Sequence, residues 1–288
     1  MVVFVILHYL SYENTESLIE TILKEIIGEK RIIVVDNASP NDSGKLLKRQ
    51  FYGNQNIQII LNANNLGFAN AMNLGFEKAK NYHPQFIILM NNDIHLEQTD
   101  FITRIHQSYL NSPFAVLGPD VYVPETRMHQ NPKQIEAYTA EQVQMILDYN
   151  KSLITLPRFL FIGRAYLKQS KILKRIVFKI RNRKKKDPKL IAQNNIVLHG
   201  SILIFSNDFI ETGLQPFVPE TFFYFETEIL DRILRNKKMI SKFDPSIKVI
   251  HHQSSATRQN FSDLYELQNF QVMNMIKSTT VFLNMFDN

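Results

Sequence analysis

Polar side chains follow two aliphatic stretches of this sequence at the point where each stretch ends. Asp36 follows residues 31–35, and Asp93 follows residues 86–90 through Asn91 and Asn92. A carboxylate in such a place can accept hydrogen bonds from a ribose or a base, and it can supply one of the oxygen ligands that Mg²⁺ prefers. Either aspartate can instead be an ordinary loop or helix-cap residue, and both interpretations stay open at this point.

An Asn-rich segment, residues 62–75 (NANNLGFANAMNLG), lies between a predicted strand and a predicted helix. Gly67 within it permits close approach of the backbone, and the unpaired N–H groups of a helix start attract phosphate. The segment matches neither the G-x-G-x-x-G dinucleotide pattern nor a P-loop, so those two classes lose their main support. A turn without any ligand is the alternative interpretation.

The elements that must position these residues follow an α/β pattern. Short aliphatic runs predict strands, and the segments of helical period between them predict helices. Such alternation favours a largely parallel sheet flanked by helices, in which ligands bind at the carboxyl ends of the strands. The predicted strands are 2–7, 31–35, 57–61 and 86–90, and the predicted helices are 15–27, 43–51, 69–80 and one after Thr99.

The pattern breaks at Pro124, where polar and then basic sequence runs to about Gln193. Beyond it the sequence predicts sheet at 196–205, a helix at 228–236, a strand at 246–250 and a helical tail after Arg258. We therefore expect one α/β domain that is interrupted by a basic, helical insertion. The expected parts are a first half at 1–123, the insertion at 124–193, a second half at 194–257 and a C-terminal helical segment at 258–288.

The composition excludes several classes of protein. Its 288 residues are 44% hydrophobic and 21% charged, which is typical of a globular chain. The absence of cysteine excludes a disulfide scaffold, Cys-ligated zinc and a thiol nucleophile. No apolar run approaches the roughly 20 residues of a membrane-spanning helix, and the first twenty residues contain no Lys or Arg. We therefore expect neither a transmembrane nor a secreted protein.

The stretch that ends in Asp36, the Asn-rich segment 62–75 and the stretch that ends in Asp93 occur in this order. In this they resemble the family-2 inverting glycosyltransferases of the GT-A fold, particularly the rhamnosyltransferase-like branch and the capsule or O-antigen enzymes. The resemblance continues in three later segments. Residues 199–206 (HGSILIFS) are similar to the acceptor-side strand of the family, residues 221–230 (TFFYFETEIL) to its acidic motif, and residues 249–255 (VIHHQSS) to its terminal His motif. About 200 of the 288 residues are covered.

The resemblance implies a nucleotide-diphosphate sugar donor, of UDP or dTDP type, bound over the first half of the domain. His199 and Gly200 would lie on the acceptor side. Where many relatives carry a D-x-D metal motif, this chain has Asn91-Asn92-Asp93, so Asp93 with His251 would hold the divalent cation, Mg²⁺ or Mn²⁺. The implied nucleotide-sugar-binding residues are Tyr9, Asp36, Asn65, Gly67, Asn73, Asn92 and Asp93.

The same resemblance implies a single displacement in which a carboxylate removes the proton of the acceptor hydroxyl. Most relatives have adjacent acids in the acidic motif, whereas this chain has Glu226-Thr227-Glu228. The role of base then belongs to Glu226 or to Glu228. We favour Glu226, and capping of the following helix is the alternative role for whichever glutamate is not the base.

One segment is strongly basic. Residues 151–189 contain 14 Lys and Arg against the single acid Asp187, while the rest of the chain carries 19 basic and 26 acidic residues. On a helix these charges would form one face, with apolar residues opposite and phenylalanines upstream, as in helices that lie on anionic membranes. The predicted membrane-contacting residues are Phe159, Phe161, Arg164, Lys168, Lys171, Arg175 and Lys179. A helix packed on its own domain is the alternative, and no known motif supports nucleic-acid binding.

The sequence thus predicts a cytoplasmic glycosyltransferase, peripherally associated with the inner face of the cell membrane, that extends a surface glycan on a polysaccharide or lipid-linked acceptor. Two alternatives remain. A nucleotidyltransferase would normally need a Gly-rich, basic loop after its first strand, and residues 7–13 (LHYLSYE) offer none. A catalytically silent partner that binds sugar nucleotide or membrane is the other, and Thr227 makes it worth testing.

Overall fold

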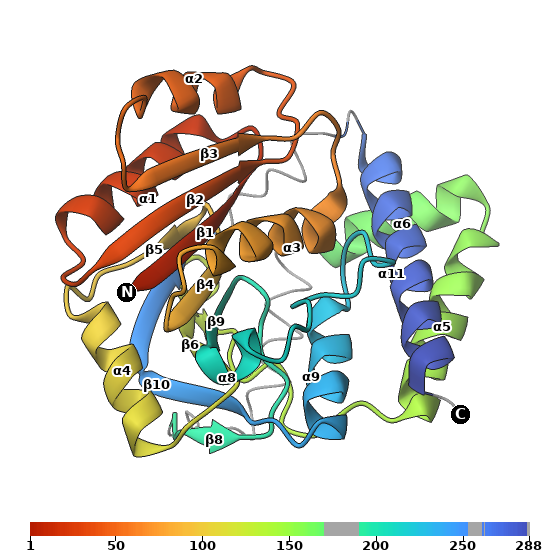
Figure 1. The fold of residues 1–288 in the computed structure, drawn as a ribbon. Coiled ribbons are helices and arrows are strands. Elements are labelled where there is room, and N and C mark those ends of the chain that lie inside the picture. The colour runs from red at the N-terminus through yellow and green to blue at the C-terminus, as the bar shows by residue number, and fades with distance from the viewer. Residues whose placement is uncertain (170–189, 253–260, 262, 287–288) are drawn as a thin grey trace.

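A mixed but mostly parallel β-sheet forms the centre of the molecule (Figure 1). The structure, a computed structural model, describes residues 1–169, 190–252, 261 and 263–286. Within these residues the strands form one sheet of order β3-β2-β1-β4-β9-β6-β10-β5, with β7 paired to β6 and β8 paired to β10. Strands β1 to β4 are parallel, as are β6 and β10, and β9 runs antiparallel between β4 and β6. The strand bounds are β1 Val2–His8, β2 Lys30–Asp36, β3 Ile57–Leu61, β4 Phe86–Asn91, β5 Ile94–His95, β6 Val116–Val123, β7 Met128–His129, β8 Gln193–Asn194, β9 Ile202–Ser206 and β10 Ser241–His251.

Helices cover both faces of the sheet because the buried side chains of each strand alternate between the two faces. One face packs against α1 (Tyr12–Lys24), α2 (Ser43–Gln50) and α4 (Phe101–Asn111). The other face packs against α3 (Gly67–Lys80), the short α8 (Asn207–Ile210) and α9 (Glu226–Asn236). The predicted α/β fold with a mostly parallel sheet flanked by helices is confirmed.

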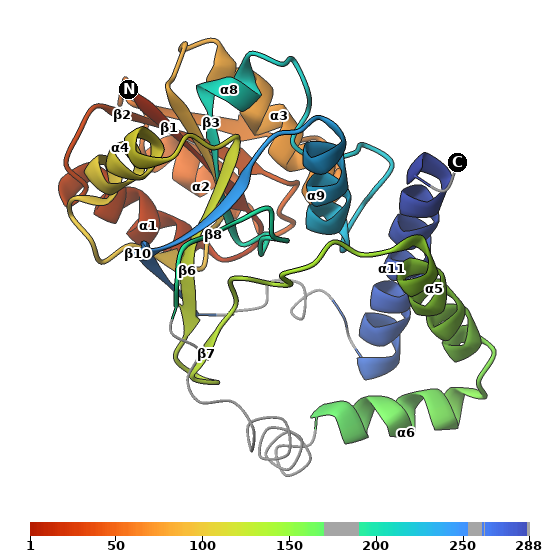
Figure 2. The same cartoon turned by 90° about the horizontal axis from the view of Figure 1, so that it is seen from below.

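A second group of helices stands beside the sheet (Figures 1 and 2). Helix α5 (Ala140–Ile154) begins at a capping box, in which Thr139 and Gln142 bond each other's backbone, and it runs alongside the C-terminal helix α11 (Leu264–Phe286). Helix α6 (Arg158–Gln169) crosses the end of this pair and packs on it through Phe161. We call α5, α6 and α11 the helical unit. No helix in the described part of the chain has the length and apolar character needed to cross a membrane.

The structure differs from the sequence-based expectation around residue 124. Strand β6 was not predicted, because Gly118 and Pro119 interrupt its apolar pattern. Residues 128–134, which the sequence assigned to the insertion, belong to the sheet domain through β7 and through a bridge between Gln134 and Val197. The part of the insertion that lies outside the sheet begins with α5, and residues 170–189 of the predicted basic helix lie outside the described residues.

Gly75 lies where α3 approaches β1 and β2. A Cβ there would meet Cγ1 of Val5 at 2.3 Å and Cγ2 of Val35 at 3.0 Å. We expect Gly75→Ala to lower the free energy of unfolding by about 1–3 kcal/mol, as overpacking does, in a urea titration. Gly163→Ala in α6 is the matched control, because a Cβ there meets nothing within 4 Å and alanine favours a helix. A Gly75→Ala protein as stable as wild type would contradict this packing.

Candidate active site

A cleft of about 1250 Å³ opens between the sheet domain and α11. It collects side chains from strand ends, from the start of α9 and from the helical unit. Asn91 and Asp93 reach it from the end of β4, His251 from the end of β10, and Glu226 from the first turn of α9. The predicted site residues that line it are Tyr9, Asn65, Asn92, Asp93, His199, Gly200, Glu226, Glu228 and His251.

Three predicted nucleotide-sugar-binding residues do not line the cleft, because the fold uses their polar groups. The carboxylate of Asp36 is buried and accepts hydrogen bonds from the backbone N–H and the hydroxyl of Ser39. The amide of Asn73 is buried and exchanges two hydrogen bonds with the backbone of Phe217. These two residues hold loops in place, and their role in binding a nucleotide sugar stays a prediction.

Gly67 also has a structural role. It lies at φ +76°, and a Cβ there would come within 2.5 Å of the carbonyl oxygen of Phe222. The first N–H groups of α3 are already bonded within the protein: Phe68 donates to the Phe222 carbonyl at 2.7 Å, and Gly67 donates to the Asn65 side chain at 2.9 Å. The expectation that these N–H groups are free to bind phosphate is wrong, because each already donates to a protein acceptor.

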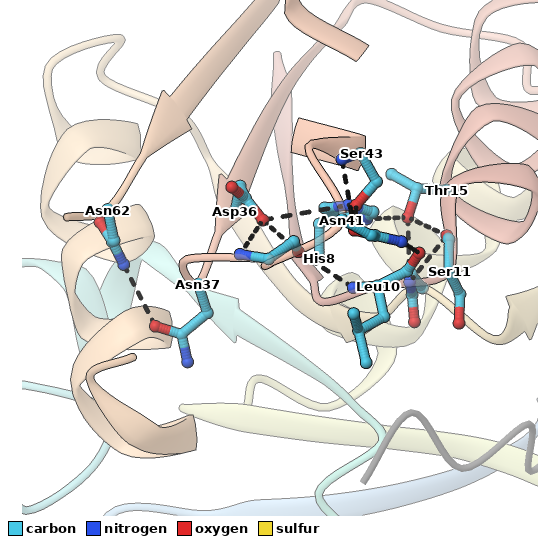
Figure 3. A network of polar contacts seen from close by, with 11 residues as sticks. His8, Leu10, Ser11, Thr15, Asp36, Asn37, Asn41, Ser43 and Asn62 are labelled. Atoms are coloured by element: carbon cyan, nitrogen blue, oxygen red, sulfur yellow. Dashed lines mark hydrogen bonds and ion pairs between the residues drawn. The ribbon is translucent and has the colours of Figure 1, made fainter. Parts of the chain in front are cut away.

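Beside the cleft, a buried polar network links the ends of β1, β2 and α1 (Figure 3). The two ring nitrogens of His8 lie 2.7 Å from the hydroxyl of Thr15 and 2.8 Å from that of Ser43, and burial lowers the pKa of His8 to about 4. The Asn92 side chain joins the network by donating to Thr15 at 2.9 Å. Asn92 thus fixes the turn that precedes Asp93, so that its neighbour faces the cleft.

Asp93 and His251 come together because β5, which follows Asp93, pairs antiparallel with the end of β10. Nε2 of His251 lies 3.2 Å from Oδ1 of Asp93, and Nδ1 of His251 lies 2.7 Å from Oε1 of Gln130. Gln130 can only accept through that oxygen, so Nδ1 carries the proton and Nε2 presents a lone pair in the neutral ring. Oδ1 of Asp93 is buried and makes no hydrogen bond.

This pair fits a divalent cation. An unbonded carboxylate oxygen and an imidazole lone pair face each other, and Gln130 holds the ring as outer partners of metal ligands do. The described residues contain no cluster of three or more His, Asp or Glu that could hold a metal. A cation at Asp93 and His251 would therefore take its other ligands from water and from a bound diphosphate, as Mg²⁺ often does.

Glu226 is placed by an unusual turn. Tyr224 and Phe225, the two residues before it, both adopt left-handed backbone conformations with φ of 70° and 68°. Glu226 then begins α9 with its side chain buried, and its Oε1 atom makes no hydrogen bond. The pKa of Glu226 is raised to about 7, chiefly by burial; the Glu228 charge acts in the same direction, while backbone N–H groups and Lys133 oppose the rise.

Glu228, one residue beyond Thr227, has the opposite environment. Nζ of Lys133 lies 2.7 Å from its Oε1 atom, and the hydroxyl of Thr227 donates to its Oε2 atom at 3.1 Å. The same lysine donates to the Thr227 hydroxyl at 3.2 Å. Of the two candidate bases, Glu228 is therefore fully bonded and Glu226 is not.

His199 and the aromatic residues complete the cleft. The backbone N–H of Ser201 donates to Nδ1 of His199 at 3.2 Å, and burial lowers the pKa of His199 to about 3, with Lys133 and His251 contributing. His199 is therefore neutral. The cleft lining also contains a group of aromatic residues, which we call the aromatic wall: Phe222, Phe223, Tyr224, Phe225, Phe261 and Phe270.

The sequence profile described as "Glycosyl transferase family 2" matches residues 3–234, which include strands β2 to β9, Asp93 and both glutamates of α9. The chain belongs to glycosyl transferase family 2. No curated protein matches the sequence.

Solved structures agree on the fold of this family member, which is that of the GT-A glycosyltransferases. The mannosyltransferase PcManGT from Pyrobaculum calidifontis, in complex with GDP-Man and Mn²⁺, is 8% identical with a TM-score of 0.52, over 99% of this chain and 74% of that one. Residues 1–349 of TarS from S. aureus are 9% identical with a TM-score of 0.53, over 99% and 72%. GalNAc-T7 with UDP, GalNAc and Mn²⁺ is 14% identical with a TM-score of 0.57, over 100% and 56%. At such identities the likeness shows the fold alone.

Of the predicted membrane-contacting residues of this family-2 chain, one phenylalanine is exposed, one is buried, and several lie outside the described residues. Phe159 is 72% exposed, but Phe161 is 3% exposed and packs against the Tyr265 ring at 5.5 Å. Phe161 is therefore removed from the predicted insertion residues. The guanidinium of Arg164 lies over the Tyr149 ring. The side chain of Lys168, and all of Lys171, Arg175 and Lys179, lie outside the described residues.

Sequence reasoning missed Lys133 and Gln130, which reach the two halves of the site from a segment assigned to the insertion. Their only signal was position, because they lie in a polar stretch that follows the first half of the domain. No pattern of residue types in the sequence predicts an ion pair such as that of Lys133 with Glu228, because the two segments are far apart in the chain.

The two glutamates should respond oppositely to neutralisation. A carboxyl whose pKa rises from 4.5 to about 7 on folding destabilises the folded state as pH rises through that window. Glu226→Gln should therefore leave stability unchanged near pH 4 and raise it above pH 7, by up to about 3 kcal/mol. Glu228→Gln should lower stability at neutral pH, because it breaks the ion pair with Lys133. Thermal unfolding of both variants between pH 4 and 8 checks this, and equal responses of the two would contradict the assignment.

Proposed function

We propose that this chain is an inverting glycosyltransferase that moves a sugar from a UDP or dTDP sugar to a hydroxyl of a glycan or lipid-linked acceptor. The main support is the environment of Glu226. Its buried carboxylate has an unbonded oxygen and a pKa of about 7, and it lies in a cleft that also contains Asp93 and His251. A base with a pKa near the working pH is both unprotonated and strong enough to take a proton.

In this mechanism Glu226 takes the proton of the acceptor hydroxyl, whose oxygen attacks the anomeric carbon of the donor. The bond from that carbon to the diphosphate breaks, and the diphosphate leaves with the electron pair. One displacement inverts the configuration of the carbon. Asp93 and His251 would hold a divalent cation, which supplies positive charge to the leaving diphosphate. Mn²⁺ in the PcManGT and GalNAc-T7 structures supports this cofactor.

The aromatic wall supports the proposed acceptor class. Rings of Phe222, Phe223 and Phe261 gather around Phe270 of α11, with centroids 5.1–6.1 Å from it. Aromatic faces suit the apolar faces of sugar rings and the chain of a lipid carrier. We therefore favour a glycan or lipid-linked acceptor of the kind used for capsule or O-antigen, with a rhamnosyltransferase-like enzyme as the specific expectation.

Donor hydrolysis and thermal shift test the function directly. UDP-, dTDP- and GDP-sugars with Mn²⁺ or Mg²⁺ should include one that raises the Tm and is turned over. Stabilisation by a sugar nucleotide without any turnover would favour the catalytically silent partner.

Asp93→Ala should abolish metal-dependent donor binding and turnover, because it removes the proposed carboxylate ligand. Isothermal titration with donor, in the presence and absence of Mn²⁺, measures this effect. Asp148→Ala on α5 is the control, because its carboxylate is bonded to Gln144 on an exposed helix face. Metal-dependent binding that survives in Asp93→Ala would refute the metal site.

We also propose peripheral attachment to the inner face of the cell membrane through α6 and the basic segment that follows it. Phe159 and Leu160, exposed by 72% and 49%, follow Arg158 at the start of α6, and Lys151 lies in the last turn of the preceding helix α5. Insertion of such side chains, with basic residues attracted to anionic lipid, is typical of interfacial helices.

Replacement of Phe159 and Leu160 by Ser should reduce sedimentation with anionic vesicles, and so should replacement of the basic residues at 175, 179, 181 and 183–186 by Gln. Raised salt should weaken wild-type binding, because exposed charges are screened. Leu110→Ser is the matched control, because Leu110 is 80% exposed on α4. If both sets of variants sediment as wild type does, the membrane assignment is wrong.

A further inference from the structure

Lys133 is the one lysine or arginine among the described residues that line the cleft. Three carboxylates, Asp93, Glu226 and Glu228, line the same cleft. Lys133 contacts only one of them in the structure, through the 2.7 Å ion pair with Glu228. The carboxylate that Lys133 pairs with is neutralised, and the other carboxylates keep oxygens that can accept a proton.

The backbone of Lys133 is held rigidly. Its N–H donates to the carbonyl of Val197 at 3.0 Å, and the next residue, Gln134, accepts from the N–H of Val197 at 2.8 Å. Two residues earlier, the buried amide of Asn131 donates to the carbonyl of Pro119 and accepts from the N–H of His199. Lys133 is thereby carried by the sheet domain towards the first turn of α9.

The hydrogen bonds around Glu228 use both of its oxygens. Lys133 occupies Oε1 and Thr227 occupies Oε2, while the Thr227 hydroxyl in turn accepts from Lys133. The Glu228 side chain is 4% exposed, so its charge depends on these two donors. Glu226 receives neither donor, and its Oε1 atom stays unbonded.

We propose that Lys133 is a positioning residue that commits Glu228 to a closed ion pair and thereby leaves Glu226 as the carboxylate that takes the acceptor proton. This inference rests on the proposed function for its catalytic part and on the contacts alone for its electrostatic part. Without Lys133, the two buried carboxylates, which are two residues apart at the start of α9, would line the same cleft with no cation beside them, and burial would favour the protonated form of each.

The other groups around Glu226 do not replace Lys133. His199 is neutral, and Tyr138 and Tyr224 are phenols whose pKa values burial raises. Asp231 on α9 is bonded to Arg235, away from the cleft lining. Helix α11 contributes Leu267, Phe270, Gln271 and Met275 to the lining, and none of these is charged.

Infrared titration of protonated carboxyls between pH 5 and 9 tests the electrostatic part. In the wild type we expect one carboxyl of this pair to titrate, and Glu226→Gln should remove it. In a Lys133→Met background, which keeps the length of the side chain, Glu226→Gln should leave one titrating carboxyl, that of Glu228. Lys133→Arg should behave as wild type. Lys24→Met controls for loss of a lysine, because its side chain is 70% exposed on α1.

Two results would overturn the proposal: a second carboxyl of the pair that titrates while Lys133 is present, or no new one in Lys133→Met. With an active donor and acceptor, Lys133→Met should lower kcat by about tenfold with little change in the donor KM, and Lys133→Arg should restore it. If no donor is turned over, the proposed function fails, and the titration alone decides the assignment of Lys133. Circular dichroism confirms that each variant is folded before titration.

Discussion

The site depends on a shortage of positive charge around buried carboxylates. Asp93, Glu226 and Glu228 all line one cleft, and each is largely removed from water. A buried carboxylate is costly unless it gains a partner or a proton. The three have different surroundings: Glu228 pairs with Lys133, Asp93 lies 3.2 Å from the His251 ring in a pair that fits a cation, and Glu226 shifts its pKa. Different environments for similar acids are what allow them different roles.

The fold creates these environments by joining chain segments that are far apart in sequence. Strand β4 brings Asp93 to the edge where parallel strands end, and β10 brings His251 to the same edge. Close packing then matters at one glycine. A Cβ at Gly118 in β6 would lie 2.8 Å from the Asn131 side chain, so this glycine makes room for the amide that anchors the segment of Lys133. The charge of the cleft is thus linked to packing inside the sheet.

Sequence reasoning located the elements well where the hydrophobic period was clear. Asp93 was singled out by its place at a strand end, and Glu226 and His251 by the family resemblance; all three line the cleft. That reasoning did not foresee which polar residues find partners inside the fold. Asp36 and Asn73 have ligand-binding chemistry, yet Ser39 and Phe217 use it. Residue type shows what a side chain can bond, and only the tertiary structure shows what it does bond.

The helical unit contacts the turn that precedes the proposed base, Glu226. Phe225, whose left-handed backbone turns Glu226 into the cleft, packs its ring against Phe282 of α11 and Tyr138. The hydroxyl of Ser278 on α11 donates to the Phe223 carbonyl at 3.3 Å. A strained turn persists only where its surroundings hold it. Helix α11 therefore holds the turn that places the proposed base, so a shift of the helical unit relative to the sheet would move Glu226 as well.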